Sequence, residues 1–103
     1  NPSNLIIKNE VWIGENVNFY NLDQIYIDDN SIISQDVYLC TGSHNHKSNF
    51  FETIHKPIKI NKNCWLCLRA TILMGVEIPA NSIIPACSYV NHKNLSSKII
   101  ERS

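Results

Sequence analysis

Aliphatic residues recur at every sixth position through the second half of the chain. The series consists of Ile60, Leu66, Ile72, Ile78, Ile84 and Val90. Four residues after each of the first five comes a small or β-branched residue, namely Cys64, Ala70, Val76, Ser82 and Ser88. A period of six fits neither an α-helix, with its period of 3.6, nor an isolated strand, with its period of 2. A fixed short repeat therefore predicts a structure of stacked coils.

The same period runs through the first half of the chain in two sets. Their leading residues are Ile7, Ile13 and Phe19, then Ile27, Ile33 and Leu39. The residues four positions later are Val11, Val17, Asp23, Ser31, Val37 and Ser43. The phase shifts by two residues near Ile25, and by fifteen between Leu39 and Ile60. The sequence therefore predicts twelve hexads in four groups of three, with both residues of each pair facing inward.

Three hexads can form one turn of a triangular prism, with a short parallel strand on each face. Stacked turns bury continuous aliphatic ladders, and their backbones pair about 4.8 Å apart. Corners need residues that tolerate a left-handed backbone, and the intervening positions are rich in them: Asn9, Gly14, Asn16, Asp28, Asp29, Asn30, Asn61, Asn63 and Asn81. A Greek-key sandwich would need regular turn signals, yet the chain has three glycines and no Asn-Gly or Asp-Gly pair. We therefore predict an all-β parallel β-helix of about four coils.

Composition indicates one folded domain over residues 1–103. The 44% apolar content suits a packed core, and nine basic residues balance nine acidic ones. That balance gives no electrostatic reason to expect nucleic acid or an anionic membrane as a partner. There is no apolar run of membrane-spanning length and no signal-peptide pattern, so we expect a cytoplasmic protein whose four cysteines are not a disulfide framework.

The last position of each hexad predicts three outward columns at the prism corners. The first column is Trp12, Ile32, Trp65 and Ile83. The second is Asn18, Tyr38, Thr71 and Tyr89. The third is Gln24, His44, Glu77 and Leu95.

Both phase shifts fall at the third corner. The longer one predicts a protruding loop at 45–58, directly after His44. Loops held by a rigid scaffold often carry function, so this corner is the candidate site. The apolar first corner needs a cover, which a homotrimer supplies if the Trp65 side of one subunit faces the His44 side of the next. Active sites would then lie between subunits.

One stretch of the sequence resembles a known family. Residues 33–44, ISQDVYLCTGSH, resemble the hexapeptide-repeat O-acetyltransferases, in the branch of colanic acid and exopolysaccharide biosynthesis. Residues 20–23, 56–58 and 64–66 fit the same branch. The resemblance covers nearly the whole chain and implies that the β-helix is left-handed.

The resemblance also implies a reaction. His44 would be the general base that deprotonates a saccharide hydroxyl, which then attacks the thioester of acetyl-CoA. An imidazole that titrates near pH 6.5 suits this role, and no metal is required. Asn21 would contact the acceptor or the oxyanion, and Glu77 would orient His44. Acetyl-CoA would lie along the outer wall beside Trp65, Cys67, Leu68, Ala86, Asn91 and His92.

The chain departs from the family pattern at several positions. Cys67, Pro79 and Pro85 stand where the family has glycine, and Asn91-His92 stands where it has Thr-Lys. The family's Gly-Asn-Pro-Ala segment does not follow, and the chain begins where the family pattern is already well under way. We therefore expect either a fragment that lacks N-terminal coils and the C-terminal segment or a shortened, weakened enzyme. These departures keep open a second hypothesis, a catalytically weak β-helix scaffold or assembly subunit.

A third hypothesis is a zinc lyase similar to carbonic anhydrase, which shares this fold. That family uses three histidines, two of them five residues apart, and His44, His46, His55 and His92 supply no such pair. His46 and His55 are expected to be solvated polar residues. Cys64 and Cys67 are expected to be structural, because the hexad phase puts them on different sides of the wall.

Overall fold

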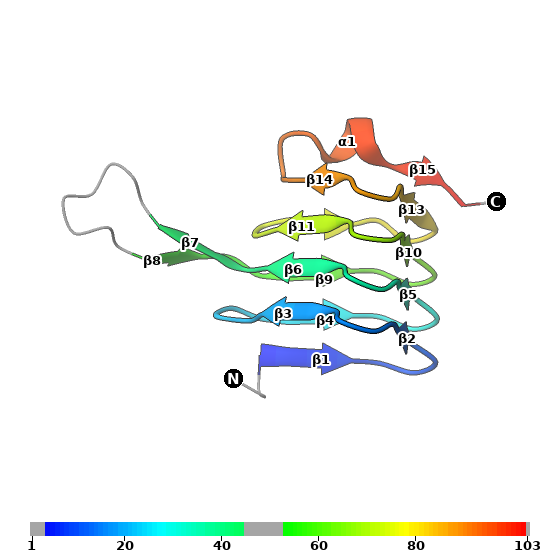
Figure 1. Ribbon diagram of the computed structural model, residues 1–103, viewed down its shortest axis with the longest axis horizontal. Helices are drawn as coiled ribbons and strands as arrows, with labels where there is room; N and C mark the ends of the chain where they lie inside the picture. The colour runs from blue at the N-terminus through cyan, green and yellow to red at the C-terminus, as the bar shows by residue number, and fades with distance from the viewer. Residues whose placement is uncertain (1–3, 45–52, 103) are drawn as a thin grey trace.

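Short parallel strands wind around three faces of a prism (Figure 1). The computed structural model describes residues 4–44 and 53–102. The first face contains β1 (Leu5–Ile7), β4 (Ile25–Ile27), β9 (Ile58–Ile60) and β12 (Glu77–Ile78). The second contains β2 (Trp12–Ile13), β5 (Ile32–Ile33), β10 (Trp65–Leu66) and β13 (Ser82–Ile84). The third contains β3 (Asn18–Tyr20), β6 (Tyr38–Cys40), β11 (Thr71–Leu73) and β14 (Tyr89–Val90).

The chain visits the three faces in turn four times, so the described residues form four coils. Each coil pairs in parallel register with the next: Ile13 lies beside Ile33, Ile33 beside Leu66, and Leu66 beside Ile84. The prediction of twelve hexads in four groups of three is therefore confirmed. The fold is the predicted all-β, left-handed parallel β-helix.

The core is a set of aliphatic ladders inside the prism. From the second coil onward, every leading residue of the hexads is fully buried: Ile27, Ile33, Leu39, Ile60, Leu66, Ile72, Ile78, Ile84 and Val90. After each phase shift, Ile25 and Ile58 take the second inward position, and both are fully buried. Ser43 was predicted to face inward but is exposed, because Thr41 takes that buried place and the chain then leaves the prism.

Two corners consist of columns of residues with positive φ. The first column is Glu10, Asn30, Asn63 and Asn81, and the second is Asn16, Asp36, Arg69 and Cys87. Four of these are asparagines that the sequence marked as corner residues. Glu10, Arg69 and Cys87 adopt the same conformation although their side chains disfavour it. Stacking of the coils therefore overrides local preference at the corners.

Cys87 gives a test of this corner strain. Its φ is 60° and its side chain is exposed, so Cys87→Gly should remove a left-handed penalty without loss of packing. The greater freedom of glycine in the unfolded chain offsets part of this gain. We therefore expect the free energy of unfolding, measured in urea, to rise by about 0.5 kcal/mol. The neighbouring exposed Ala86, whose φ is not positive, is the control. Ala86→Gly should lower the same free energy by about 0.5–1 kcal/mol, and equal effects of the two variants would contradict the strain argument.

The C-terminal segment closes the last coil instead of continuing the repeat. Helix α1 (Leu95–Lys98) leads into β15 (Ile100–Glu101), which pairs antiparallel with β13. Leu95 and Ile99 are half-buried and pack against the core. The predicted place of Leu95 in an outward corner column is therefore wrong, because this residue covers the end of the prism.

The long insertion contains an antiparallel hairpin that projects from the prism (Figure 1). Its strands are β7 (Gly42–His44) and β8 (Thr53–His55). Gly42 pairs with His55, and His44 pairs with Thr53. The sequence predicted a protruding loop over 45–58. Residues 45–52 lie outside the described part of the chain, residues 53–55 form β8, and Ile58 belongs to the prism.

Candidate active site

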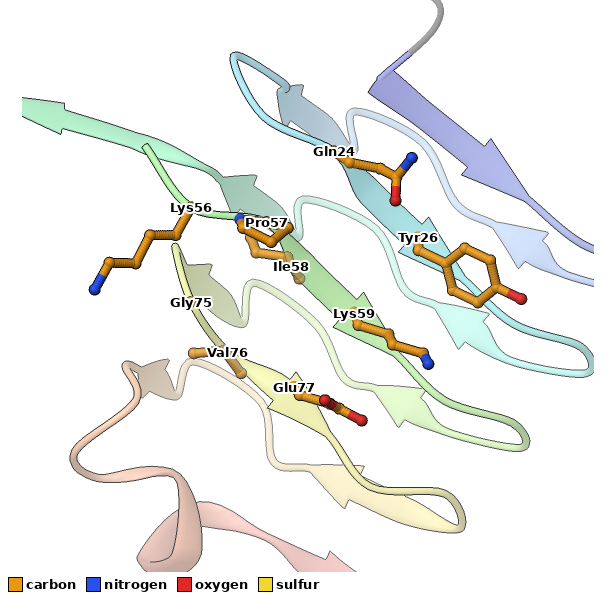
Figure 2. A pocket seen from close by; sticks show the side chains of 9 residues that line it. All are labelled: Gln24, Tyr26, Lys56, Pro57, Ile58, Lys59, Gly75, Val76 and Glu77. Atoms are coloured by element: carbon orange, nitrogen blue, oxygen red, sulfur yellow. The ribbon is translucent and has the colours of Figure 1, made fainter. Parts of the chain in front are cut away.

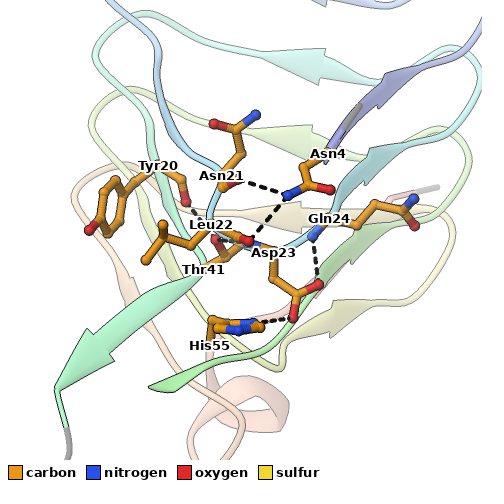
Figure 3. Close-up of polar contacts among 8 residues, drawn as sticks. All are labelled: Asn4, Tyr20, Asn21, Leu22, Asp23, Gln24, Thr41 and His55. Atoms are coloured by element: carbon orange, nitrogen blue, oxygen red, sulfur yellow. Dashed lines mark hydrogen bonds and ion pairs between the residues drawn. The ribbon is translucent and has the colours of Figure 1, made fainter. Parts of the chain in front are cut away.

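Thr41 is the buried residue at which the hairpin leaves the prism. Its carbonyl accepts a hydrogen bond from the backbone N–H of Lys56 at 3.0 Å, which closes the neck of the insertion. Its backbone N–H donates to the carbonyl of Tyr20 at 3.0 Å, and its Oγ1 donates to the same carbonyl at 2.6 Å. Oγ1 also accepts the backbone N–H of Asp23 at 3.0 Å. Thr41 thus ties the neck to the corner at residues 20–23 (Figure 3).

Two of the predicted catalytic residues lie at this corner region. His44 is on the hairpin, where its backbone pairs with Thr53; its side chain lies outside the described part of the structure. Asn21 is half-buried in the turn between β3 and β4 (Figure 3). The side-chain amide of Asn4 donates to the carbonyls of Asn21 and Leu22 at 3.3 and 3.1 Å. The roles of His44 and Asn21 stay predictions.

An aspartate and a histidine pair at the base of the hairpin. His55 Nδ1 donates to Asp23 Oδ2 at 2.8 Å, and the other oxygen, Oδ1, accepts the backbone N–H of Gln24 at 2.7 Å (Figure 3). The hydrogen bond from His55, and then that from Gln24, lower the pKa of Asp23 below its usual value. The sequence assigned neither residue to the site. One signal was available in the sequence. Asp23 lies four residues after a leading hexad residue, a position at which most other hexads have a small or β-branched residue.

Glu77 is not stacked on His44, so the predicted third column is wrong. Pairing on the first face instead aligns Tyr26 with Lys59 and Lys59 with Glu77. The inserted residues come before β4 and β9. Each of these strands therefore pairs with its neighbouring coil only after the insertion ends. Glu77 accepts a hydrogen bond from the side-chain amide of Asn61 at 3.2 Å. No described contact joins Glu77 to the hairpin, so its proposed role in orienting His44 has no geometric support among the described residues.

A cavity of about 590 Å³ opens on the first face beside the hairpin neck (Figure 2). Its polar lining comes from Gln24, Tyr26, Lys56, Lys59 and Glu77. The ammonium of Lys59 lies 5.5 Å from the centroid of the Tyr26 ring. Amide, ammonium and carboxylate groups around an aromatic ring suit a polar ligand with several hydroxyls.

A second hollow, of about 360 Å³, lies around the corner between the second and third faces. Its lining residues are Trp12, Ser34, Gln35, Trp65, Cys67, Leu68 and Ala86. The indole N–H of Trp65 donates to Ser34 Oγ at 3.0 Å, which fixes the ring along the wall. Four of the six residues predicted to contact acetyl-CoA line this groove: Trp65, Cys67, Leu68 and Ala86.

The other two predicted acetyl-CoA residues, Asn91 and His92, do not line this groove. Asn91 Oδ1 accepts the backbone N–H groups of Lys93 and Asn94, both at 2.9 Å, and so shapes the turn before α1. His92 is exposed in the same turn.

The first and second outward columns have the predicted register, but they lie on strands of the second and third faces and not at the predicted corners. Trp12 pairs with Ile32, Ile32 with Trp65, and Trp65 with Ile83. Asn18, Tyr38, Thr71 and Tyr89 align in the same way on the third face. The exposed fractions of Trp12 and Trp65 are 58% and 39%, so the first column remains a large apolar surface.

The cysteines are unpaired and occupy different environments. Cys64 is fully buried in the prism, whereas Cys67 is half-buried in the outer groove, as the hexad phase predicts. Burial raises the pKa of both thiols. Within residues 4–44 and 53–102, no three His, Cys, Asp or Glu side chains gather closely enough to hold a metal. Nor does that part of the chain contain a helix with the length and apolarity needed to cross a membrane.

The chain is similar to curated acetyltransferases. The chain is 39% identical over 101 residues to the "Putative colanic acid biosynthesis acetyltransferase WcaF" of Escherichia coli K12 and, equally, to that of Shigella flexneri. The alignment covers 98% of this chain and 55% of the relative, so the chain spans about half the length of the curated proteins it matches. No protein-family model matches the sequence.

Solved structures share the fold. A hexapeptide-repeat acetyltransferase from Vibrio cholerae O1 biovar eltor, complexed with acetyl-CoA, superposes with a TM-score of 0.80 at 32% identity, over 85% of this chain and 50% of that protein. The polysialic-acid-specific acetyltransferase NeuO gives 0.74 at 24% identity, over 84% of this chain and 43% of NeuO, a likeness of fold alone. The chain therefore has the same left-handed β-helix fold as these acetyltransferases.

Proposed function

We propose that the protein is an acetyl-CoA-dependent O-acetyltransferase that acts on a saccharide hydroxyl. The observation that carries this proposal is the 39% identity to WcaF over 98% of the chain. The 32% identical Vibrio protein, which was crystallised with acetyl-CoA, supports the choice of acyl donor. The name of WcaF, which refers to a polysaccharide, supports a saccharide as the acceptor.

In the proposed reaction His44 takes the proton of the acceptor hydroxyl as its oxygen attacks the thioester carbonyl. Donors such as the Asn21 amide would stabilise the tetrahedral oxyanion. The carbon–sulfur bond then breaks, and the CoA thiolate leaves and takes up the proton from His44. The groove formed by Trp65, Cys67 and Leu68 offers an apolar wall for the pantetheine chain, and the polar cavity beside Lys56 is the candidate acceptor pocket.

A homotrimer is part of the proposal. The exposed indoles of Trp12 and Trp65 form a surface that association would cover. In a closed threefold assembly, the Trp65 side of one subunit would meet the hairpin side of the next, which would bring the groove and His44 together. A cytoplasmic location, where acetyl-CoA is available, fits the same reaction.

Binding and transfer can be measured separately. Calorimetry should give saturable binding of acetyl-CoA, and mass spectrometry should detect an added acetyl group on an oligosaccharide from a panel of neutral and uronic-acid-containing acceptors. A parallel titration with adenosine 3′,5′-bisphosphate, which lacks pantetheine, controls for binding of the nucleotide alone. If neither acetyl-CoA binding nor transfer is found in the full-length protein, the scaffold hypothesis replaces the transferase.

A further inference from the structure

We propose that Asp23 and His55 form a positioning pair that fixes the hairpin against the prism and thereby sets the place of His44. Only the catalytic consequence rests on the proposed function, because the anchoring of the hairpin is a property of the fold. Neither residue contacts a reacting atom in this proposal, since they act through the hairpin.

The hairpin needs an anchor at its base. Its described part consists of three residue pairs, from Gly42–His55 to His44–Thr53. A two-stranded ribbon of this kind is marginally stable in water. The side chains of Thr53, Ile54 and His55 in β8 are all exposed, so this strand is not packed into the core. Contacts at the neck must therefore determine its direction.

Asp23 is well suited to be the fixed half of the anchor. Its backbone N–H donates to Thr41 Oγ1 at 3.0 Å, and Thr41 is fully buried. Its Oδ1 accepts the backbone N–H of Gln24 at 2.7 Å. The carboxylate is thus oriented by the prism itself, and Oδ2 is left to accept His55 Nδ1 at 2.8 Å. Because this hydrogen bond joins a prism corner to β8, it ties the return strand of the hairpin to the first coil.

The outgoing strand is held by the residues just before Asp23. A Cβ atom at Gly42 would lie 2.7 Å from Leu22 Cδ1 and 3.1 Å from Tyr20 Cε2. The backbone of β7 therefore sits directly against these two side chains. Residues 20–23 hold both strands, with apolar contact on one and a hydrogen bond on the other. His44 follows Gly42 by two residues, and its partner Thr53 precedes His55 by two, so movement at the base carries His44 with it.

Asp23→Asn tests the anchor, with Asp28→Asn as a matched control. Asp28 Oδ1 accepts the backbone N–H of Asp29 at 2.7 Å, the same local bond that Asp23 makes to Gln24. Both variants therefore lose a corner carboxylate that makes this bond, while Asp23→Asn also weakens the charged hydrogen bond to His55. Hydrogen–deuterium exchange is followed by mass spectrometry on peptides that contain residues 42–44 and 53–55. Asp23→Asn should raise exchange in these peptides roughly fivefold and leave the four coils unchanged. His55→Gln should have the same effect, and Asp28→Asn should have none on the hairpin.

The kinetic arm uses the acetyl-transfer assay. Asp23→Asn should lower kcat roughly tenfold and leave the KM for acetyl-CoA within twofold, because the groove lies on another corner of the prism. Unchanged exchange in the hairpin, or increased exchange throughout the coils, would overturn the anchor. Faster hairpin exchange with an unchanged kcat in an active enzyme would overturn the positioning of His44. If the wild-type protein transfers no acetyl group, the proposed function fails, and the exchange measurement alone still decides the anchor.

Discussion

Replacement of His44 by alanine should lower the rate of acetyl transfer about 1,000-fold, as loss of a general base typically does. A saccharide hydroxyl is a poor nucleophile at neutral pH, and the proposed site supplies the imidazole that accepts its proton. The measurement is kcat for acetyl transfer at saturating acetyl-CoA, before and after His44→Ala. This variant has the largest expected effect on activity because no other described residue is proposed to act as the base.

The binding of acetyl-CoA separates a catalytic role of His44 from a structural one. The groove that contains Trp65 and Leu68 lies on a different corner from the hairpin, so the dissociation constant should stay within twofold. The melting temperature should also be retained, since His44 belongs to the projecting hairpin and not to the core. A variant that transfers acetyl at the wild-type rate, or one that no longer folds, would rule out the role of general base.

The fold could be predicted because one physical constraint repeats in every coil. Ile33, Leu66 and Ile84 share a ladder, and each must point inward for the next coil to stack on it. A period of six therefore persists wherever the prism persists. For the same reason the two columns that lie within unbroken runs of hexads, those of Trp65 and Tyr38, have the predicted register.

The third corner could not be predicted in the same way. After an insertion, the strand resumes where its backbone can pair, so Lys59 and not His44 lies beside Glu77. The neck depends on Thr41, which is buried because the chain leaves the prism directly after it. The hexad phase does not predict this burial. Contacts between Asp23 and His55, 32 residues apart, leave no periodic trace in the sequence. The interruption of the repeat therefore indicated the candidate site, whereas the polar contacts at the neck required the structure.

Cys87 and Arg69 illustrate a second limit of prediction. Neither residue type favours positive φ, yet both occupy the corner column that begins with Asn16. Their conformation is imposed by backbone pairing with the coil below: Cys87 N–H donates to the carbonyl of Leu68 at 2.8 Å. Local sequence identified the asparagines at the corners, whereas these two positions follow only from the stacked coils.

Filling of the groove beside Trp65 should block acetyl-CoA. Ala86 is an exposed residue of the groove lining, in a hollow of about 360 Å³. The indole of Ala86→Trp would occupy the space proposed for pantetheine, so the dissociation constant of acetyl-CoA should rise about 100-fold, equivalent to ~2.7 kcal/mol. Calorimetry measures this constant, and circular dichroism checks that the β-helix is intact.

The control for that variant is Ala80→Trp. Ala80 is also exposed and also precedes a residue with positive φ, Asn81, but it does not line the groove. Its replacement adds the same indole to an equivalent corner and should leave the affinity within twofold. Normal binding by Ala86→Trp would place acetyl-CoA elsewhere on the protein, and equal losses in the two variants would point to a general effect of the added ring. A loss confined to Ala86→Trp would locate the acyl donor in the groove at the corner between the second and third faces, away from the hairpin that carries His44. In the proposed trimer, the hairpin of one subunit would bring the base to the groove of the next, so the same result would fit that assembly.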